Sequence, residues 1–295
     1  MTSKGNGNII DLESIKKGES ENMNKKVVLI TGASSGIGRD TALVLKDMGY
    51  TVYGAARRVD KMKDLEKEGI SVLPLDVTVE KSMVDCVDSI LKKEGRIDIL
   101  VNNAGYGFYG AVEDVPIDEA RKQLEVNLFG LARMTQLVLP TMRKQHSGKI
   151  INISSMAGKI STPFGAWYHA TKYALEGFSD CLRMETKPFG IDVVLIEPGA
   201  IKTNWGIIAA DNLAEVSAKG AYTKQANHVI NYLRRSYSSD KISKPEIISK
   251  TIAKAVSAKR PKTRYLVGYG AKLSVFSKRV LSDRAFDRMI QKTMR

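Results

Sequence analysis

Short apolar runs that alternate with longer helical stretches restrict the fold of this chain more than any other feature. A strand buried on both faces of a sheet reads as a continuous run of Val, Ile and Leu, and residues 25–31 (KKVVLIT) are the first such run. Strands separated by helices are joined by right-handed crossovers and form a parallel sheet. The sequence therefore predicts the α/β class, with a single doubly wound parallel sheet of about seven strands and helices on both faces. The predicted strands are residues 25–31, 51–55, 71–75, 97–101, 149–154, 192–197 and 264–267.

Three stretches depart from this alternation. Residues 1–24 are polar and rich in Gly, Asn, Ser and Lys, which predicts a disordered extension; Met23 offers an alternative start. Residues 203–245 carry few strand signals and read as an insertion near the carboxyl edge of the sheet. Residues 271–295 place apolar side chains at helical spacing among many Lys and Arg, which predicts a basic amphipathic helix. Residues 25–270, including the insertion over residues 203–245, are expected to form one domain.

Charge is concentrated at the end of the chain. The 295 residues include 46 Lys and Arg against 32 Asp and Glu, and residues 201–295 hold 20 of those basic residues but only 6 of the acidic ones. No recognition module accompanies this excess, so nucleic-acid binding is not expected. The basic amphipathic helix can lie on an anionic membrane surface, or its apolar stripe can pack against this protein's own sheet or a second subunit. Packing is the favoured alternative.

The N-terminal residues, the cysteines and the histidines indicate the cellular compartment of the protein and whether it binds a metal. Residues 1–24 lack the apolar core of a secretory signal, and the longest apolar runs are too short to span a bilayer. Cys86 and Cys181 lack C-x-x-C spacing and are predicted to be reduced. His146, His169 and His228 lack ligand spacing, so no metal site is expected. We expect a cytoplasmic protein, with membrane contact at most peripheral.

The first predicted strand leads into a glycine-rich turn, Thr31–Gly38 (TGASSGIG). Gly32, Gly36 and Gly38 lack a Cβ atom, so the backbone can adopt positive φ and approach a ligand closely. The helix that follows would direct the positive end of its dipole at an anion. Tight packing is the alternative explanation of such a turn. Its position, at the first strand–helix turn of a doubly wound sheet, favours a Rossmann-type dinucleotide site.

The end of the second predicted strand bears on the choice of cofactor. An NAD site usually carries a carboxylate there, which bonds the ribose 2′-hydroxyl, but this chain has Arg57 and Arg58 instead. The Arg57 guanidinium could bind a 2′-phosphate, so NADP(H) is favoured over NAD(H). A solvated arginine pair at the start of a charged helix is the alternative. The turn itself supplies no second cation, because Ser34 and Ser35 occupy it.

The order of these and later motifs resembles the short-chain dehydrogenase/reductase family. The resemblance is close over about residues 25–202 and looser to about residue 290. It implies a Rossmann-fold catalytic domain over residues 25–270, with residues 203–245 as a substrate lid, and assembly as a homodimer or homotetramer. The matching motifs are T-G-x-x-x-G-x-G at Thr31–Gly38, N-N-A-G at Asn102–Gly105, Asn127, Ser155, Y-x-x-x-K at Tyr168–Lys172, and P-G at Pro198–Gly199.

The resemblance also implies which residues contact the cofactor. Asp76 would face the adenine, and Thr203 would face the nicotinamide carboxamide. The full implied set is Gly32, Ser34, Ser35, Gly36, Ile37, Gly38, Arg57, Asp76, Val77, Asn103, Ala104, Gly105, Tyr168, Lys172, Pro198, Gly199, Ile201 and Thr203.

Four residues are expected to be catalytic. Tyr168 and Lys172 are four apart on a helical pattern, so both project from one face. A phenol with a pKa near ~10 needs a nearby cation to act as a base at neutral pH, and Lys172 would provide one. Ser155 would bond the same substrate oxygen. The resemblance implies that Lys172 also binds the nicotinamide ribose and that Asn127 holds a water linking Lys172 to solvent.

The segments around these residues are mostly apolar, which favours a lipophilic alcohol or ketone as the substrate. The stretches 103–110, 161–168 and 196–203 look most like the 17β-hydroxysteroid-dehydrogenase-like branch, so a steroid-like lipid is expected. A 3-oxoacyl thioester reductase and a non-catalytic NADP(H)-binding regulatory protein are the alternatives. The predicted substrate contacts are Ser155, Tyr168, Phe108, Met156, Phe164 and Trp205.

Overall fold

The computed structural model describes residues 26–294. The predicted extension over residues 1–24 lies outside the described residues, and so does Arg295 at the other end. The seven predicted strands all form, within two residues of the expected bounds, and build one parallel sheet in the order β3-β2-β1-β4-β5-β6-β7. The α/β doubly wound fold is therefore confirmed. The strands are β1 (Val27–Thr31), β2 (Thr51–Ala56), β3 (Ser71–Pro74), β4 (Ile99–Asn102), β5 (Gly148–Ile153), β6 (Ile191–Pro198) and β7 (Arg264–Val267).

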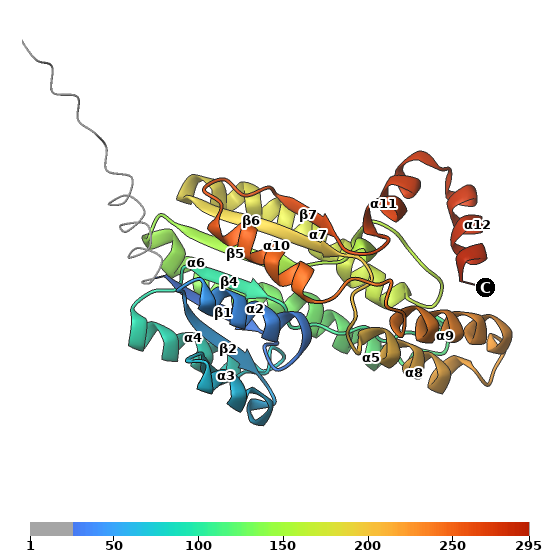
Figure 1. Ribbon diagram of the computed structural model, residues 1–295, viewed down its shortest axis with the longest axis horizontal. Helices are drawn as coiled ribbons and strands as arrows, with labels where there is room; N and C mark the ends of the chain where they lie inside the picture. Colours follow the sequence, from blue (N-terminus) through green and yellow to red (C-terminus); the bar gives the residue numbers. More distant parts are fainter. Residues whose placement is uncertain (1–25, 295) are drawn as a thin grey trace, which may run out of the picture.

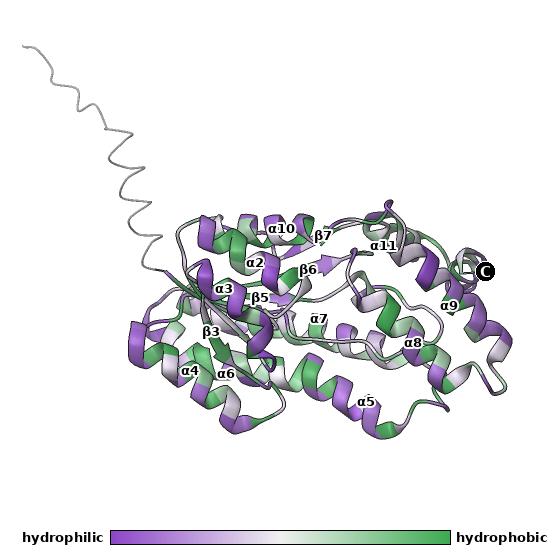
Figure 2. Cartoon of the chain, turned by 60° about the horizontal axis from the view of Figure 1, so that its bottom comes forward, coloured by the Kyte–Doolittle hydropathy of each residue, from purple (hydrophilic) through white to green (hydrophobic). Residues whose placement is uncertain are grey.

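Helices cover both faces of this sheet (Figure 1). On one face α2 and α10 pack together over β1, β2 and β6, and on the other face α4, α6 and α7 enclose a second apolar core. Figure 2 shows how peripheral helices such as α4 and α5 alternate between hydrophobic and hydrophilic residues, as one-sided burial requires. The helices of this part are α2 (Gly36–Asp47), α3 (Lys63–Lys67), α4 (Glu80–Glu94), α5 (Ile117–Leu124), α6 (Leu131–Lys144), α7 (Ala166–Thr186) and α10 (Glu246–Ser257).

The long helical stretch predicted over residues 117–145 is interrupted. A π-helical turn, Glu125–Gly130, lies between α5 and α6. Gly130 allows this turn to lie directly against the backbone of Val77, because a Cβ atom there would collide with the Val77 carbonyl. The π turn contains Asn127, which is one of the predicted catalytic residues.

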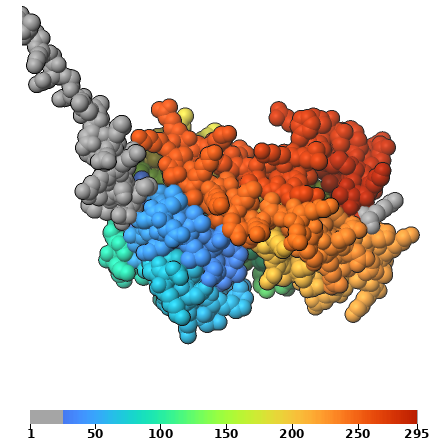
Figure 3. All heavy atoms as spheres, in the orientation of Figure 1, coloured from blue at the N-terminus to red at the C-terminus, as the bar shows by residue number. Residues whose placement is uncertain are grey.

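The predicted lid is a pair of helices, α8 (Trp205–Ser217) and α9 (Thr223–Tyr237), packed against each other at the carboxyl edge of the sheet. The chain then adds α10 and β7 before it reaches the C-terminal segment. In Figure 3 the red C-terminal helices lie beside the orange lid helices, at the end of the molecule away from the blue first strands and helices.

The C-terminal segment differs from the single helix that the sequence predicts. It forms two helices, α11 (Ala271–Val280) and α12 (Asp283–Thr293), because Leu281 and Ser282 adopt extended backbone between them. Lys278 closes the turn through an ion pair of 2.5 Å with Asp283. The buried apolar side chains Phe286 and Ile290 of α12 belong to an apolar cluster that also includes lid side chains and contains no strand residue.

Candidate active site

The glycine-rich turn joins β1 to α2 at the carboxyl edge of the sheet. Gly32 has φ +68° and Gly36 has φ +54°, conformations that residues with a Cβ rarely adopt. A Cβ on Gly32 would lie 2.9 Å from the Cα of Ala104, whereas the nearest described atom to one on Gly36 is Thr203 Cγ2, at 3.7 Å. Gly32 thus permits a close backbone approach, and Gly36 leaves room for a ligand at the start of α2.

The start of α2 can receive an anion. The helix begins at Gly36, and the residue before it, Ser35, makes no side-chain capping hydrogen bond. The first N–H groups of a helix have no partner within the helix, and they carry its positive dipole end. Gly38 contributes differently from the prediction: it is buried and does not line the cavity, because its Cα packs against the side chain of Asn103. Its role is helix–loop packing.

Asn103 holds the turn in place. Its Nδ2 donates hydrogen bonds to the carbonyl oxygens of Thr31, at 3.0 Å, and Gly32, at 3.2 Å. The Thr31 hydroxyl in turn accepts from the backbone N–H groups of Asn103 and Ala104, both at 3.0 Å. The ends of β1 and β4 are therefore cross-linked directly beneath the turn.

A charged rim follows at the ends of β2 and β3. Arg57 is exposed there, and its positive charge interacts with the carboxylate of Asp76. Burial alone would raise the pKa of Asp76, but two hydrogen bonds from Thr78 and the charge of Arg57 outweigh it and lower that pKa below its ordinary value. Both Arg57 and Asp76, with the neighbouring Val77, line the same cavity as the turn.

The cavity has a volume of about 1410 Å³ and runs along the carboxyl ends of the strands. This is where ligands bind in doubly wound sheets. It brings together residues that are far apart in the sequence. Of the predicted cofactor and catalytic residues, those on its wall are Gly32, Ser34, Ser35, Gly36, Ile37, Arg57, Asp76, Val77, Asn103, Ala104, Gly105, Ser155, Tyr168, Lys172, Pro198, Gly199, Ile201 and Thr203.

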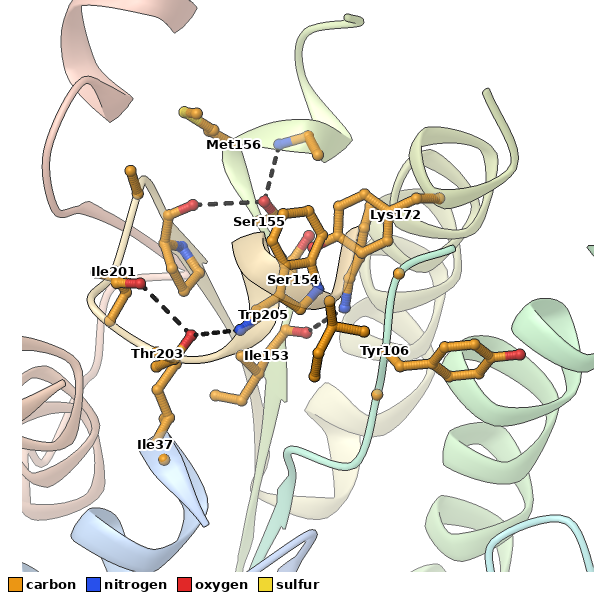
Figure 4. Close-up of a pocket in the computed structure, with 18 of the residues that line it drawn as sticks. Ile37, Tyr106, Ile153, Ser154, Ser155, Met156, Lys172, Ile201, Thr203 and Trp205 are labelled. Carbon is orange, nitrogen blue, oxygen red and sulfur yellow. Dashed lines mark hydrogen bonds between the residues drawn. The ribbon is translucent and has the colours of Figure 1, made fainter. Parts of the chain in front are cut away.

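Ser155, Tyr168 and Lys172 all line this cavity. Figure 4 shows Ser155 and Lys172 among its lining residues. Ser155 follows the end of β5, and its Oγ donates to the Pro198 carbonyl oxygen at 3.4 Å and accepts from a backbone N–H at 3.1 Å. Tyr168 and Lys172 come from the first turns of α7. The Lys172 Nζ donates to the Ile153 carbonyl oxygen at 2.8 Å and lies 5.8 Å from the centre of the Tyr168 ring.

Burial dominates the electrostatics of this trio. It raises the pKa of Tyr168 well above the ordinary phenol value, although a hydrogen bond with Ser155 acts in the opposite direction. Burial also lowers the pKa of Lys172 to about 8, against the charge of Glu176, which raises it. At neutral pH Lys172 is therefore mostly a cation and Tyr168 a neutral phenol. The lysine does not by itself produce a phenolate in this state.

Asn127 is buried and does not line the cavity. Its Oδ1 accepts from the N–H of Tyr106 at 3.0 Å, and its Nδ2 donates to the Tyr106 carbonyl oxygen at 2.8 Å and to the Thr171 hydroxyl at 3.2 Å. Its side chain thus ties the loop after β4 to α7, beside Lys172. The expected water-holding role stays a prediction.

Aromatic rings enclose Tyr168. The Trp205 ring centre lies 5.0 Å from that of Tyr168, and Tyr109 stands edge-on to Trp205 at 5.6 Å. Gly107 lets the indole approach, since a Cβ there would lie 2.6 Å from Trp205 Cζ2. Tyr237 contacts the other side of Trp205, at 6.0 Å. This packing excludes water from the phenol and accounts for its raised pKa.

The predicted substrate wall needs correction at two positions. Met156 and Trp205 line the cavity, but Phe108 and Phe164 do not. Phe108 is held by its backbone, whose N–H donates to Gln123 at 3.0 Å, and Phe164 packs edge-on against Tyr222 at 6.1 Å. Much of the wall was not predictable from local sequence, because it comes from α9, α11 and α12. These additional residues are Tyr232, Leu233, Tyr237, Leu273, Met289, Ile290 and Met294.

Comparison with known proteins agrees with this fold. Residues 26–212 match the family model described as short chain dehydrogenase. A probable short-chain type dehydrogenase/reductase of Helicobacter pylori, VdlC, is 36% identical over 90% of this chain and 96% of its own. A 3-ketodihydrosphingosine reductase of Bacteroides thetaiotaomicron is 38% identical over 83% of this chain and 89% of its own.

Solved structures show the same likeness. A short-chain dehydrogenase from Streptomyces avermitilis superposes with a TM-score of 0.76 and 34% identity, covering 90% of this chain and 97% of that one. A serine dehydrogenase complexed with NADP+ superposes with a TM-score of 0.70 and 26% identity, covering 82% of this chain and 94% of that one.

The family match and the similar proteins identify the chain as an oxidoreductase that acts on CH–OH groups. Such an enzyme uses a nicotinamide dinucleotide, in keeping with the fold and the glycine-rich turn described above. The chain belongs to the short-chain dehydrogenase/reductase family. The relatives reported above do not single out the 17β-hydroxysteroid-dehydrogenase-like branch, which stays a prediction.

Proposed function

We propose that the protein interconverts a ketone and a secondary alcohol on a lipophilic substrate, with NADP(H) as the preferred cofactor and Tyr168 as proton donor and acceptor. The observation that carries this proposal is the meeting of Ser155, Tyr168 and Lys172 in one cavity with the glycine-rich turn. Proton transfer needs a titratable group near the reacting oxygen, and phosphate binding needs the turn. The common cavity serves both.

Tyr168 is a neutral phenol at physiological pH, and burial raises its pKa further, so it can donate its proton to a carbonyl oxygen during reduction. The donation leaves a phenolate, and the Lys172 cation 5.8 Å from the ring stabilises that negative charge. Ser155 can reorient its hydroxyl, held by a long 3.4 Å bond, toward the same substrate oxygen. The bound nicotinamide supplies or accepts the hydride. In the oxidising direction the same groups act in reverse order.

Residues present in the cavity fit a dinucleotide. Gly36 leaves room where a Cβ would project, α2 presents uncapped N–H groups there, and Thr203 borders the same space. The residues proposed to hold the pyrophosphate are those of the turn, and Asp76 and Val77 are proposed for the adenine. Arg57 is the group that supports NADP(H) over NAD(H), since an exposed guanidinium at this rim can bind a 2′-phosphate bidentately. The NADP+ complex of the serine dehydrogenase is in keeping with this preference.

A lipophilic substrate is supported by the wall on the lid side. Trp205, Tyr232 and Leu233 of the lid line the cavity together with Met289 and Ile290 of α12. Such a wall favours an extended apolar chain over a sugar. The name of the Bacteroides relative, a 3-ketodihydrosphingosine reductase, points to a lipid ketone as well. Assembly as a homodimer or homotetramer remains part of the proposal.

A purified-enzyme screen tests the proposal. NADPH or NADH would be combined with long-chain ketones, steroids, short aliphatic ketones and 3-oxoacyl thioesters, and cofactor oxidation followed at 340 nm. Turnover of a long-chain or steroid ketone, faster with NADPH, is the expected result. Turnover confined to thioesters would identify an acyl reductase instead. Tight NADPH binding without turnover of any ketone would favour a regulatory protein.

A further inference from the structure

Helix α11 presents an apolar stripe to solvent. Leu273 is 73% exposed, Phe276 is 63% exposed and Val280 is 59% exposed. These three residues are spaced by three and four, so they form one row along the helix. In α12, by contrast, Phe286 is 1% exposed, belongs to the apolar cluster that includes lid residues, and has the Lys278 ammonium 5.3 Å from its ring centre. The two halves of the C-terminal segment thus differ: α12 packs its apolar side chains inside the protein, and α11 displays them.

Positive charge borders this stripe on one side. Lys272 lies one turn before Phe276, and Arg279 lies one turn after it, so both flank the stripe on the same side. Both side chains are exposed. The one lysine of α11 that faces the neighbouring helix, Lys278, is already neutralised by Asp283. The exposed face therefore combines apolar and cationic groups.

Exposed basic residues continue onto α12. They are Arg284, Arg288 and Lys292. The only acidic residues in this segment are Asp283, which is paired, and Asp287. The outer face of the whole segment is therefore positive.

The other side of the stripe borders the cavity. Leu273, Ser274 and Ser277 line the cavity that contains Tyr168, and Leu273 also belongs to the exposed stripe. The exposed apolar surface and the cavity wall are therefore continuous across α11. A lipophilic molecule lying on this surface would meet the cavity without crossing water.

We propose that α11 docks the protein on the surface of an anionic lipid bilayer, with Leu273, Phe276 and Val280 at the acyl boundary and Lys272 and Arg279 among the headgroups. No helix of the described residues is long and apolar enough to span a membrane, so this contact lies along the surface. Delivery of substrate through the adjoining cavity rests on the proposed function, whereas docking itself does not.

Charge favours a bilayer over a second copy of the chain as the occupant. Two copies that met symmetrically through this face would bring Lys272 and Arg279 toward their own equivalents, and like charges repel. An anionic leaflet attracts these side chains and takes up the apolar row at the same time.

Vesicle flotation tests the proposal directly. The full chain would be mixed with vesicles of 30% phosphatidylserine in phosphatidylcholine, or of phosphatidylcholine alone, and the bound fraction measured. Binding to the anionic vesicles is expected, with weakening as salt rises, because the Debye length shortens from about 8 Å at 0.15 M to about 3 Å at 1 M. Absence of binding to the anionic vesicles would overturn the proposal.

Three variants locate the contact. Phe276→Ser with Val280→Ser should lower partitioning at least tenfold, because two apolar side chains lose their buried environment. Lys272→Ala with Arg279→Ala should lower it about 25-fold, at about fivefold for each basic residue. Met184→Ser is the matched control: Met184 is 63% exposed but lies in the last turn of α7, at the opposite edge of the sheet. Equal losses in all three would refute docking through α11.

Measurements of ketone reduction distinguish a failure of membrane docking from a failure of the proposed function. The Phe276→Ser/Val280→Ser protein should reduce a short water-soluble ketone at the wild-type rate but lose at least tenfold with a ketone embedded in anionic vesicles. No turnover of any ketone by the wild type would contradict the proposed function and leave the flotation result standing. Light scattering measures whether the stripe instead binds a second copy of the chain. A wild-type dimer that dissociates in this variant would assign the stripe to a dimer interface and would overturn docking on a bilayer.

Discussion

Arg57→Ala is expected to weaken NADPH binding by roughly 10- to 30-fold while leaving NADH binding nearly unchanged. A charge-assisted hydrogen bond contributes about 1.5–3 kcal/mol. Arg57 is exposed at the cavity rim, where water screens the contact, so the lower part of that range applies, about 1.5–2 kcal/mol. At about 1.4 kcal/mol per factor of ten this gives the expected ratio.

Fluorescence titration of each cofactor against the wild type and the variant measures these affinities. Arg58→Ala is the matched control, because Arg58 is the next residue, is equally charged and exposed, and also lines the cavity. It is expected to change the NADPH affinity less than threefold. An unchanged NADPH/NADH ratio in Arg57→Ala would refute the assignment, and a large effect in Arg58→Ala alone would move it by one residue. Equal losses for both cofactors would indicate damage to the rim.

The other predictions concern the turn, a buried acid and the lid. Gly36→Ala should cost about 1–2 kcal/mol of stability, because Gly36 has positive φ, and should weaken the binding of both cofactors. Urea unfolding and cofactor titration measure the two effects; unchanged affinity would refute pyrophosphate binding at the glycine-rich turn. Burial and the charge of Glu176 raise the pKa of Glu197 to about 7, so the folded state retains a proton there that the unfolded chain has lost. The contribution of Glu197 to the free energy of unfolding should therefore fall as pH rises from about 4.5 to about 7. Glu197→Gln removes this contribution, so over that range the free energy of unfolding of the variant should fall less, or rise more, than that of the wild type; an equal slope in both proteins would contradict it. Phe286→Ala should destabilise the protein by about 3–5 kcal/mol in urea unfolding, because Phe286 is fully buried in the apolar cluster it shares with lid residues. A cost under about 1 kcal/mol would mean that this side chain does not hold α12 in place.

Local patterns were sufficient to predict the sheet. Buried parallel strands read as continuous apolar runs, so β1 could be placed from residue types alone. The short edge strand β7 is only partly buried and could be placed from its Tyr and Val, which favour strands. The turn at Gly32 and Gly36 was predictable for a similar reason, since positive φ at both positions needs glycine. Ser155, Tyr168 and Lys172 could be brought together because strand ends and first helical turns meet at the carboxyl edge.

The substrate wall was not predictable in the same way. It joins segments as distant as Met156 and Met294, which come together only in the folded tertiary structure. Helical periodicity ran across the break at Leu281, so the sequence indicated one helix where the structure has two. Phe108 and Phe164 lie next to catalytic segments in the chain, but neighbouring packing turns them away from the cavity. Proximity in sequence was the wrong guide there.

Tyr168→Phe tests the central claim most directly. The measurement is a pair of values on the same preparation: the dissociation constant for NADPH, and the turnover number with the best ketone of the substrate screen. Loss of general acid catalysis is expected to lower turnover by at least a hundredfold, with NADPH binding within about threefold of the wild type, because only the hydroxyl is removed. Turnover within tenfold of the wild type would contradict the account, since another group would then be moving the proton.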